Sequence, residues 1–174
     1  MKTLKAIIVL TLGLLIANAT YASENTGATA TSASASGSGN YGVGLAAVSG
    51  TNGSYVINSS SGSVGSLDSV TEVENVNSVS LTAASPIYGS HAASAQVVIP
   101  SGATGYASYS VTNSAYGSAS ASIGSYSFSA GNKSSKSGSV TLSPGTYSLS
   151  TSSSNGYNSG TSVATVNLSI TLDD

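Results

Sequence analysis

Few residues in this chain could carry out acid–base or nucleophilic chemistry. Its 174 residues include one histidine and no cysteine or tryptophan, and 6% of them are charged. A serine–histidine–acid arrangement of His91 with Asp68 or Glu72 is formally available. However, the chain holds neither a G-x-S-x-G nor an S-x-x-K motif, and serine is so abundant that its presence near His91 carries little information. We therefore predict that His91 lies in a loop and that the protein is not an enzyme.

Asp68, Glu72 and Glu74 form the one cluster of acidic residues. In a strand they would share a face, where carboxylates can serve glycosidase chemistry or, together with asparagine and backbone oxygens, hold calcium. The D-x-[DN]-x-[DN]-G calcium loop is absent, which favours a solvated acidic face and leaves calcium binding open. One histidine and no cysteine exclude a transition-metal cluster, and no nucleotide-binding fingerprint occurs. We expect no cofactor.

The charge balance excludes two classes of partner. The formal net charge is −2, and two of the four basic residues are Lys2 and Lys5 at the extreme N-terminus. A nucleic-acid-binding protein needs a basic patch that displaces counterions from phosphates, and an anionic membrane surface attracts a similar patch. We therefore predict no nucleic-acid partner and no membrane insertion of the mature chain.

The first segment has the layout of a secretory signal peptide. A basic start is followed by the apolar run Ala6–Ala17 and by small residues at Ala19 and Ala22. The apolar run is shorter than the about 20 residues that span a bilayer. The order of basic, apolar and small segments predicts residues 1–22 as a signal peptide and a protein that is secreted to the extracellular space or cell surface.

Residues 23–40 are low in complexity and rich in serine, alanine and glycine. Ala28 and Ala30 alternate with polar residues, as do Ala33 and Ala35, with a change of parity at Ser32. This composition predicts a flexible arm, although an arm that pairs with a neighbouring chain is the alternative. The folded domain is then expected over residues 41–174.

The rest of the chain is predicted to be all-β. Ala164, Val166, Leu168, Ile170 and Leu172 fall on one face of a strand, and the run 96–99, ended by Pro100, indicates a strand buried on both faces. Gly124 marks a bend, Pro144-Gly145 a hairpin turn or a corner between sheets, and the period of three over residues 64–81 favours bent strands over a short helix around 68–75. The spacing of turn signals favours an antiparallel β-sandwich, jelly-roll or Ig-like.

Two functional hypotheses from different classes follow. The first is a secreted structural protein, a homopolymer that forms an extracellular fibre, a pilus-like filament or a biofilm matrix by β-strand addition. Its assembly strands would be the arm, through Ala28, Ala30, Ala33 and Ala35, or the C-terminal strand, through Ala164, Val166, Leu168, Ile170 and Leu172. The alternative is an adhesive module that binds extracellular polysaccharide or another surface through tyrosines such as Tyr106, Tyr109 and Tyr116. An ice-binding surface lacks the Thr-x-Thr repeat it would need.

Overall fold

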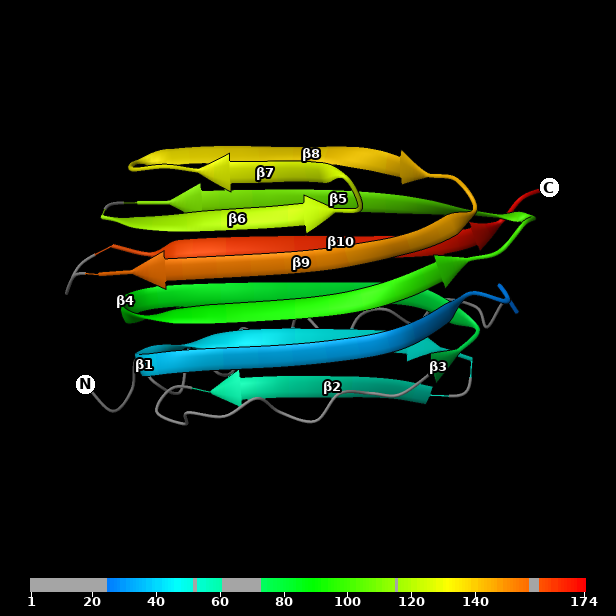
Figure 1. Ribbon diagram of the computed structural model, residues 1–174, viewed down its shortest axis with the longest axis horizontal. Coiled ribbons are helices and arrows are strands. Elements are labelled where there is room, and N and C mark those ends of the chain that lie inside the picture. The colour runs from blue at the N-terminus through cyan, green and yellow to red at the C-terminus, as the bar shows by residue number, and fades with distance from the viewer. Residues whose placement is uncertain (1–24, 52, 61–72, 115, 157–159) are drawn as a thin grey trace.

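The computed structural model describes residues 25–51, 53–60, 73–114, 116–156 and 160–174, which form strands and turns (Figure 1). The strands are β1 (Thr29–Gly50), β2 (Gly53–Ser60), β3 (Val73–Glu74), β4 (Val76–Ile99), β5 (Ala103–Asn113), β6 (Gly117–Ile123), β7 (Tyr126–Ala130), β8 (Ser134–Leu142), β9 (Gly145–Asn155) and β10 (Ser162–Leu172). Among these residues no helix has the length and apolarity needed to span a bilayer. The predicted signal peptide lies outside the described residues.

The strands form two stacked antiparallel sheets of six, because β1 and β4 contribute to both (Figure 1). Sheet I has the order β7-β6-β9-β4-β1, with β3 at the end, and uses the C-terminal half of β4 and the N-terminal half of β1. Sheet II has the order β8-β5-β10-β4-β1-β2 and uses the other halves of the two long strands. The all-β sandwich expected from the sequence is thus confirmed.

The two long strands pass from one sheet to the other while they remain paired. Between the pairs Tyr41↔Ile87 and Val43↔Ala84 the register shifts, so β4 has a bulge in which Ser85 and Pro86 lie opposite the single residue Gly42 of β1. Gly42 has φ +142°, a conformation that side chains rarely adopt, and a Cβ there would collide with the His91 ring. Glycine is therefore required where the paired strands β1 and β4 bend from one sheet into the other.

From β4 onward the chain pairs in a nested order. The N-terminal half of β4 pairs with β10 and its C-terminal half with β9, while β5 pairs with β8 and β6 with β7. The first segment thus meets the last, and the innermost pair is a tight hairpin. This arrangement results when one long antiparallel pair of strands bends repeatedly, so that consecutive segments of the pair lie alternately in the two sheets.

The core lies between the sheets and is built by period-two alternation of small residues. The runs SASASGS over 32–38 and SASASI over 118–123 place alanine or isoleucine inward and serine outward. On sheet II the inward residues are larger, among them Leu81, Val166 and Leu168, all nearly inaccessible to solvent. At one edge the Tyr109 and Phe128 rings stack with centroids 3.5 Å apart, which joins β5 of sheet II to β7 of sheet I. Small side chains facing large ones give a dense core despite the low hydrophobic content.

The predictions made from the clearest turn and strand patterns are confirmed. Strand β4 ends at Ile99, immediately before Pro100, and Gly124 lies in the two-residue turn of the β6–β7 hairpin with φ +57°. Pro144-Gly145 is a corner between sheets, since β8 pairs with β5 and β9 with β4 and β6. The described part of the 64–81 segment is strand, interrupted at Asn75 with φ +53°.

The flexible arm expected over residues 23–40 is wrong for its described part. Strand β1 begins at Thr29 and pairs with β4 along sheet I, so the folded domain begins well before residue 41. Ala28, Ala30, Ala33 and Ala35 are at most 1% exposed. Alanine fills a pocket poorly, but inside a sandwich its small size lets the sheets approach closely. The parity change foreseen at Ser32 is present as a register shift between Ala30 and Ser32.

Two further sequence expectations need correction. Residues 96–99 alternate in exposure, with Val97 and Ile99 buried, Val98 half-buried and Gln96 exposed, because one face of this strand points to solvent. Leu172, expected on the buried face of the C-terminal strand, is 47% exposed since it lies at the end of β10 beyond the core. The other four residues of that face are buried as predicted.

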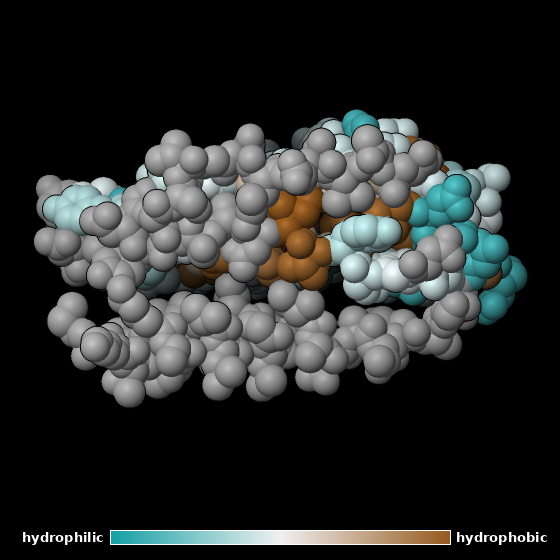
Figure 2. Space-filling model, turned by 90° about the horizontal axis from the view of Figure 1, so that it is seen from below, coloured by the Kyte–Doolittle hydropathy of each residue, from teal (hydrophilic) through white to brown (hydrophobic). Residues whose placement is uncertain are grey.

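The lower edge of the sandwich, formed by β1 and β2, shows hydrophobic side chains in its middle and hydrophilic ones at one end (Figure 2). Tyr55 and Val56 of β2 are each 49% exposed. The opposite edge, formed by β7 and β8, carries Lys133 in the connecting turn and Lys136 in register with core-facing Val111. An inward-pointing lysine on an edge strand opposes pairing with another chain.

A charge at Ala33 tests whether residues 29–38 belong to the folded domain. We expect Ala33→Asp to lower the free energy of unfolding by about 3 kcal/mol or more, because the carboxylate would be buried without a partner. Ser32→Asp places the same charge on an exposed neighbour and should change stability by about 0.5 kcal/mol or less. Urea unfolding followed by circular dichroism measures both variants. Equal stability of the two would mean that this segment is a free arm after all.

Candidate functional site

The outer face of sheet I is a regular array of serines, which we call the serine face. Outward positions on five adjacent strands are almost all serine, because their period-two runs are aligned by the strand pairing. The members are Ser32, Ser34, Ser36 and Ser38 of β1, Ser90 and Ser94 of β4, Ser148, Ser150, Ser152 and Ser154 of β9, Ser118, Ser120 and Ser122 of β6, and Ser127 and Ser129 of β7. Neighbouring strands are about 4.8 Å apart, and successive outward positions along one strand are about 6.7 Å apart.

Many of these hydroxyls hydrogen-bond to one another across strands. The oxygen–oxygen distance is 2.8 Å for Ser34–Ser94 and 2.7 Å for both Ser120–Ser152 and Ser122–Ser150. Ser90 donates to Ser154 at 3.2 Å. Within each pair one hydroxyl donates, so the pair still offers one donor and free acceptor positions to a ligand. The pairing fixes the orientation of the hydroxyls before anything binds.

A hollow of about 530 Å³ interrupts this face. It is lined from four neighbouring strands, by Ser36 to Ser38 of β1, Ser90 to Ala92 of β4, Ser152 to Ser154 of β9 and Ser118 of β6. At its centre is Ala92, which stands in the row Ser36–Ala92–Ser152–Ser120 where a serine would continue the pattern. Three spacings between strands make the hollow about 14 Å long across the strands.

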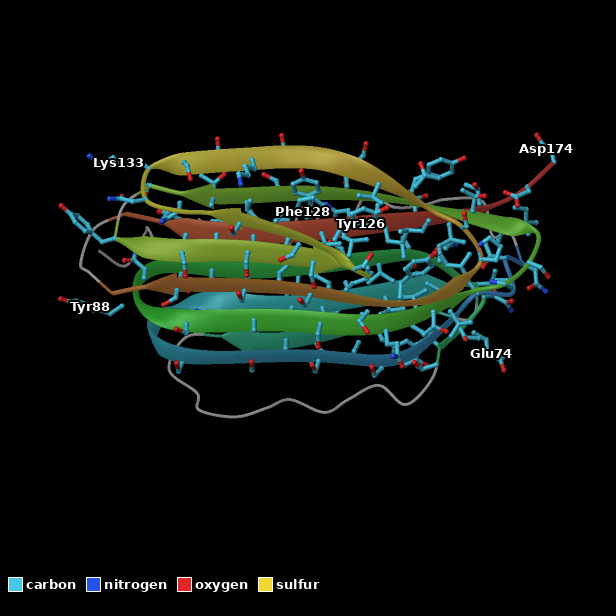
Figure 3. The ribbon with its side chains drawn as sticks, turned by 45° about the horizontal axis from the view of Figure 1, so that its top comes forward. Glu74, Tyr88, Tyr126, Phe128, Lys133 and Asp174 are labelled. Carbon is cyan, nitrogen blue, oxygen red and sulfur yellow. The ribbon has the colours of Figure 1, made fainter. Side chains whose placement is uncertain are left out.

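The five strands that form the serine face, β1, β4, β9, β6 and β7, carry no acidic side chain and no lysine. Short side chains stand along the strands, while the labelled charged residues lie at the ends, with Glu74 and Asp174 at one end and Lys133 at the other (Figure 3). Tyr88 lies at the Lys133 end (Figure 3). The face is therefore a neutral, hydroxyl-rich surface, suited to a partner that offers donors and acceptors without charge.

His91 is buried beneath the hollow and not, as expected, in a loop. It is in β4 and 2% exposed, because Pro86 lies at a strand bend and the ladder resumes beyond it. Its Nδ1 lies 3.0 Å from Ser85 Oγ, which donates to the Ser153 carbonyl at 3.2 Å. With a proton on Nδ1, His91 donates to Ser85 Oγ, and Ser85 in turn donates to the Ser153 carbonyl. The His91 Nε2 atom has no hydrogen-bond partner in the described structure.

This environment favours the neutral imidazole. Burial lowers the pKa of His91 below its usual value of 6.5, since an imidazolium would place an N–H without an acceptor in the interior. Its neighbour Ser85 is fully buried. The described acidic residue Glu74 pairs with Thr29, about 26 Å along β1 from the partner of His91. His91 and Ser85 are structural groups that hold the folded-over hairpin.

The predicted acidic cluster is not assembled in the described part of the molecule. Asp68 and Glu72 lie outside the described residues, and Glu74 is exposed in β3. Within the described segments, no group of three histidine, cysteine or acidic residues could hold a metal ion. Calcium binding at these three positions stays a prediction.

The tyrosines proposed as one binding surface are spread over the molecule. Tyr106 is 54% exposed and lies in sheet II, in register with Ser169 and Thr141, while Tyr109 faces inward onto Phe128. Tyr116, at 59% exposure, precedes β6 of sheet I. Tyr88 precedes the serines of β4. Gly89 and Gly117, the residues that follow Tyr88 and Tyr116, both pair with Asn155 of β9. Tyr88 and Tyr116 therefore each precede by two residues a serine that lines the hollow, Ser90 in β4 and Ser118 in β6.

The sequence contains a pattern that points to this site. Serine recurs every second residue over 32–38, 118–122 and 148–154. Each run by itself indicates only a strand with one polar face. That the three runs lie side by side on one sheet follows from the nested pairing, which no local pattern contains.

The chain matches no known family. No family model matches it and no curated protein does. Among solved structures it is similar to the carbohydrate-binding module TmCBM61 in complex with β-1,4-galactotriose, with a TM-score of 0.35 and 10% identity over 55% of this chain and 71% of that one. It is also similar to a variant of oxalate decarboxylase from Bacillus subtilis, with a TM-score of 0.20 and 8% identity over 82% and 66%. Likenesses this weak carry no argument, so function rests on the geometry of the chain itself.

The burial of His91 predicts how stability depends on pH. Because its pKa is lowered in the folded state, its contribution to stability is complete above about pH 6.5 and is lost as the pH falls through the folded pKa. The slope for one group is at most about 1.4 kcal/mol per pH unit. Urea unfolding at several pH values measures it, with His91→Gln, which does not titrate, as the control. The same slope in both proteins would assign the pH dependence to other groups.

Proposed function

We propose that this protein is a secreted, non-catalytic binding protein that attaches to extracellular polysaccharide through its serine face. The observation that carries this proposal is the uncharged array of serine hydroxyls, interrupted by a hollow that is open to solvent on the outside of sheet I. We also assign the nested strand pairing to the jelly-roll form of the sandwich, one of the two forms expected from the sequence.

The chemistry of the face matches that of a sugar polymer. Sugar hydroxyls are both donors and acceptors, as are serine hydroxyls, so each side can satisfy the other whichever way individual protons point. A serine loses little rotamer freedom on binding, and the cross-strand pairs are already oriented, which lowers the entropic cost of association. Many weak contacts of this kind suit a long repetitive ligand better than a small molecule.

Two exposed tyrosines strengthen the match to carbohydrate. Tyr88 and Tyr116 each lie two residues before a serine that lines the hollow, Ser90 and Ser118, and are 45% and 59% exposed. A tyrosine ring presents an apolar surface with a polar tip, and the apolar face of a sugar ring can stack on it. The hollow with its neighbouring tyrosines thus offers both kinds of contact that a sugar chain uses.

Lysines on the serine face test this function. We expect Ser152→Lys and Ser120→Lys each to weaken binding to insoluble neutral polysaccharides, such as cellulose and chitin, by about ten-fold or more, since a long hydrated cation would stand in the contact. Ser108→Lys, on the exposed outer face of sheet II, is the matched control and should bind like the unmodified protein. Co-sedimentation with the solid polysaccharide measures all three.

Two results would contradict polysaccharide binding by the serine face. If the unmodified protein binds no polysaccharide under these conditions, or if the three lysine variants lose binding equally, the serine face is not the attachment surface. Thermal unfolding of each variant checks that it is folded, which is expected because all three positions are on the outside of the sandwich.

Assembly into an extracellular fibre is a second proposal. The strand edge on which it rests differs from the two strands predicted from the sequence. Strand β10 is paired on both sides, by β4 and β5, and the N-terminal segment is already part of sheet I. Over 32–39, however, β1 pairs with β4 alone within the described residues, and this edge is uncharged. A second copy could add here by backbone hydrogen bonds.

Electron microscopy of the purified mature protein in negative stain tests the fibre proposal. Filaments that form from protein alone would support it, and their loss in Ser34→Lys would locate the contact at β1, because lysine on an edge strand opposes pairing. Monodisperse particles at all concentrations would rule out self-assembly and leave the binding function unaffected.

A further inference from the structure

Three of the serines that line the hollow have hydroxyls without a partner. No hydrogen bond is made by the side chains of Ser36, Ser38 or Ser118 within the part of the chain that the structure describes. All three line the hollow, and all three are exposed. The hollow thus has three free hydroxyls beside the paired hydroxyls of Ser90, Ser152 and Ser154.

Two neighbouring rows explain why these hydroxyls are free. In the row Ser36–Ala92–Ser152–Ser120, Ser152 bonds to Ser120, and Ala92 gives Ser36 nothing to bond with. In the row Ser38–Ser90–Ser154–Ser118, the two central serines bond to each other, which leaves the outer two without partners.

Ala92 therefore has two consequences. Its methyl group leaves more room in the hollow than a serine side chain would, and its lack of a hydroxyl leaves Ser36 without a cross-strand partner. A serine at this position would lie between Ser36 and Ser152, in the same row. It would both occupy part of the hollow and offer its neighbours a cross-strand bond, as on the rest of the face.

The hollow also has a direction. It crosses β1, β4, β9 and β6 and is lined by three residues of each of the first three strands and by one of β6, so it is about twice as long across the strands as along them. Ser38 and Ser118 lie at its two ends, and Tyr88 and Tyr116 lie two residues before the lining residues Ser90 and Ser118. A linear chain fits this shape best when it lies across the strands.

We propose that the hollow around Ala92 binds a neutral, unbranched polysaccharide chain lying across the strands of sheet I, held by the free hydroxyls of Ser36, Ser38 and Ser118. This rests on the proposed polysaccharide-binding function and names its site and ligand class. No lysine or arginine lines the hollow. A carboxylated or sulfated chain would give up water around its charges without gaining a cationic partner, so charged polymers are disfavoured.

The test uses native-gel affinity electrophoresis with soluble polymers in the gel: hydroxyethyl cellulose and galactan as neutral chains and alginate as a charged one. We expect Ala92→Ser to weaken binding to the neutral chains by roughly ten-fold, and Ser36→Ala and Ser118→Ala by roughly three- to ten-fold each, the loss expected for one hydrogen bond. Alginate should retard none of the proteins.

Two control variants separate the hollow from the rest of the face and from general effects of the substitution. Ala84→Ser makes the same change on the same strand but in sheet II, and Ser122→Ala removes a hydroxyl that is paired with Ser150 outside the hollow. Both should bind like the unmodified protein. If Ala92→Ser does not fold, Ser36→Ala and Ser118→Ala still test the site.

The outcomes distinguish this inference from the function on which it rests. No binding of either neutral chain by the unmodified protein, together with none in the co-sedimentation assay, would overturn both. Binding that is unaffected by Ala92→Ser, Ser36→Ala and Ser118→Ala would overturn the hollow as the site and leave polysaccharide binding in place. Retardation by alginate as strong as by the neutral chains would overturn the neutral ligand class.

Discussion

The architecture depends on one backbone constraint, the fold-over of the β1–β4 hairpin at Gly42. Two strands of more than twenty residues stay paired as they leave one sheet and enter the other, which requires a bulge that a side chain would block. His91 packs against this glycine, and its imidazole bonds to Ser85 on the far side of the bend. Because both sheets share these strands, their relative position is set by covalent continuity as well as by packing.

That fold-over also determines which side of sheet I meets water. Once the hairpin has bent, the alanines of the N-terminal half of β1 must face the core, and the alternate serines must face outward. The nested pairing then brings β9 and β6 alongside with the same alternation. The serine face is therefore a product of this strand pairing, and Ala92, the one alanine among its outward positions, lies in the hollow.

Local patterns were sufficient for much of the fold and for little of the site. Strand β10 could be predicted because five apolar residues, four of them large, alternate over its length. The Pro144-Gly145 corner could be predicted because proline fixes φ and glycine permits conformations that other residues avoid. Residues 29–40 were misjudged because alanine and serine have weak strand preferences, and only the pairing with β4 decides their state. His91 was misplaced for a related reason, since Pro86 ends most strands but here lies at a bend within one. The free hydroxyls around Ala92 depend on which serines are opposite one another, and registers between distant strands cannot be read from a single run.

The confinement of charge to the ends and one edge of the sandwich has a consequence for where such a protein can work. Contacts between charged groups weaken as dissolved salt rises, because ions screen them over about 10 Å at moderate ionic strength. Hydroxyl-to-hydroxyl contacts have no net charge to screen, and association at this face is not accelerated by long-range attraction. Attachment through the serine face would thus be slow to form but nearly indifferent to salinity, equally firm in fresh water and in brine.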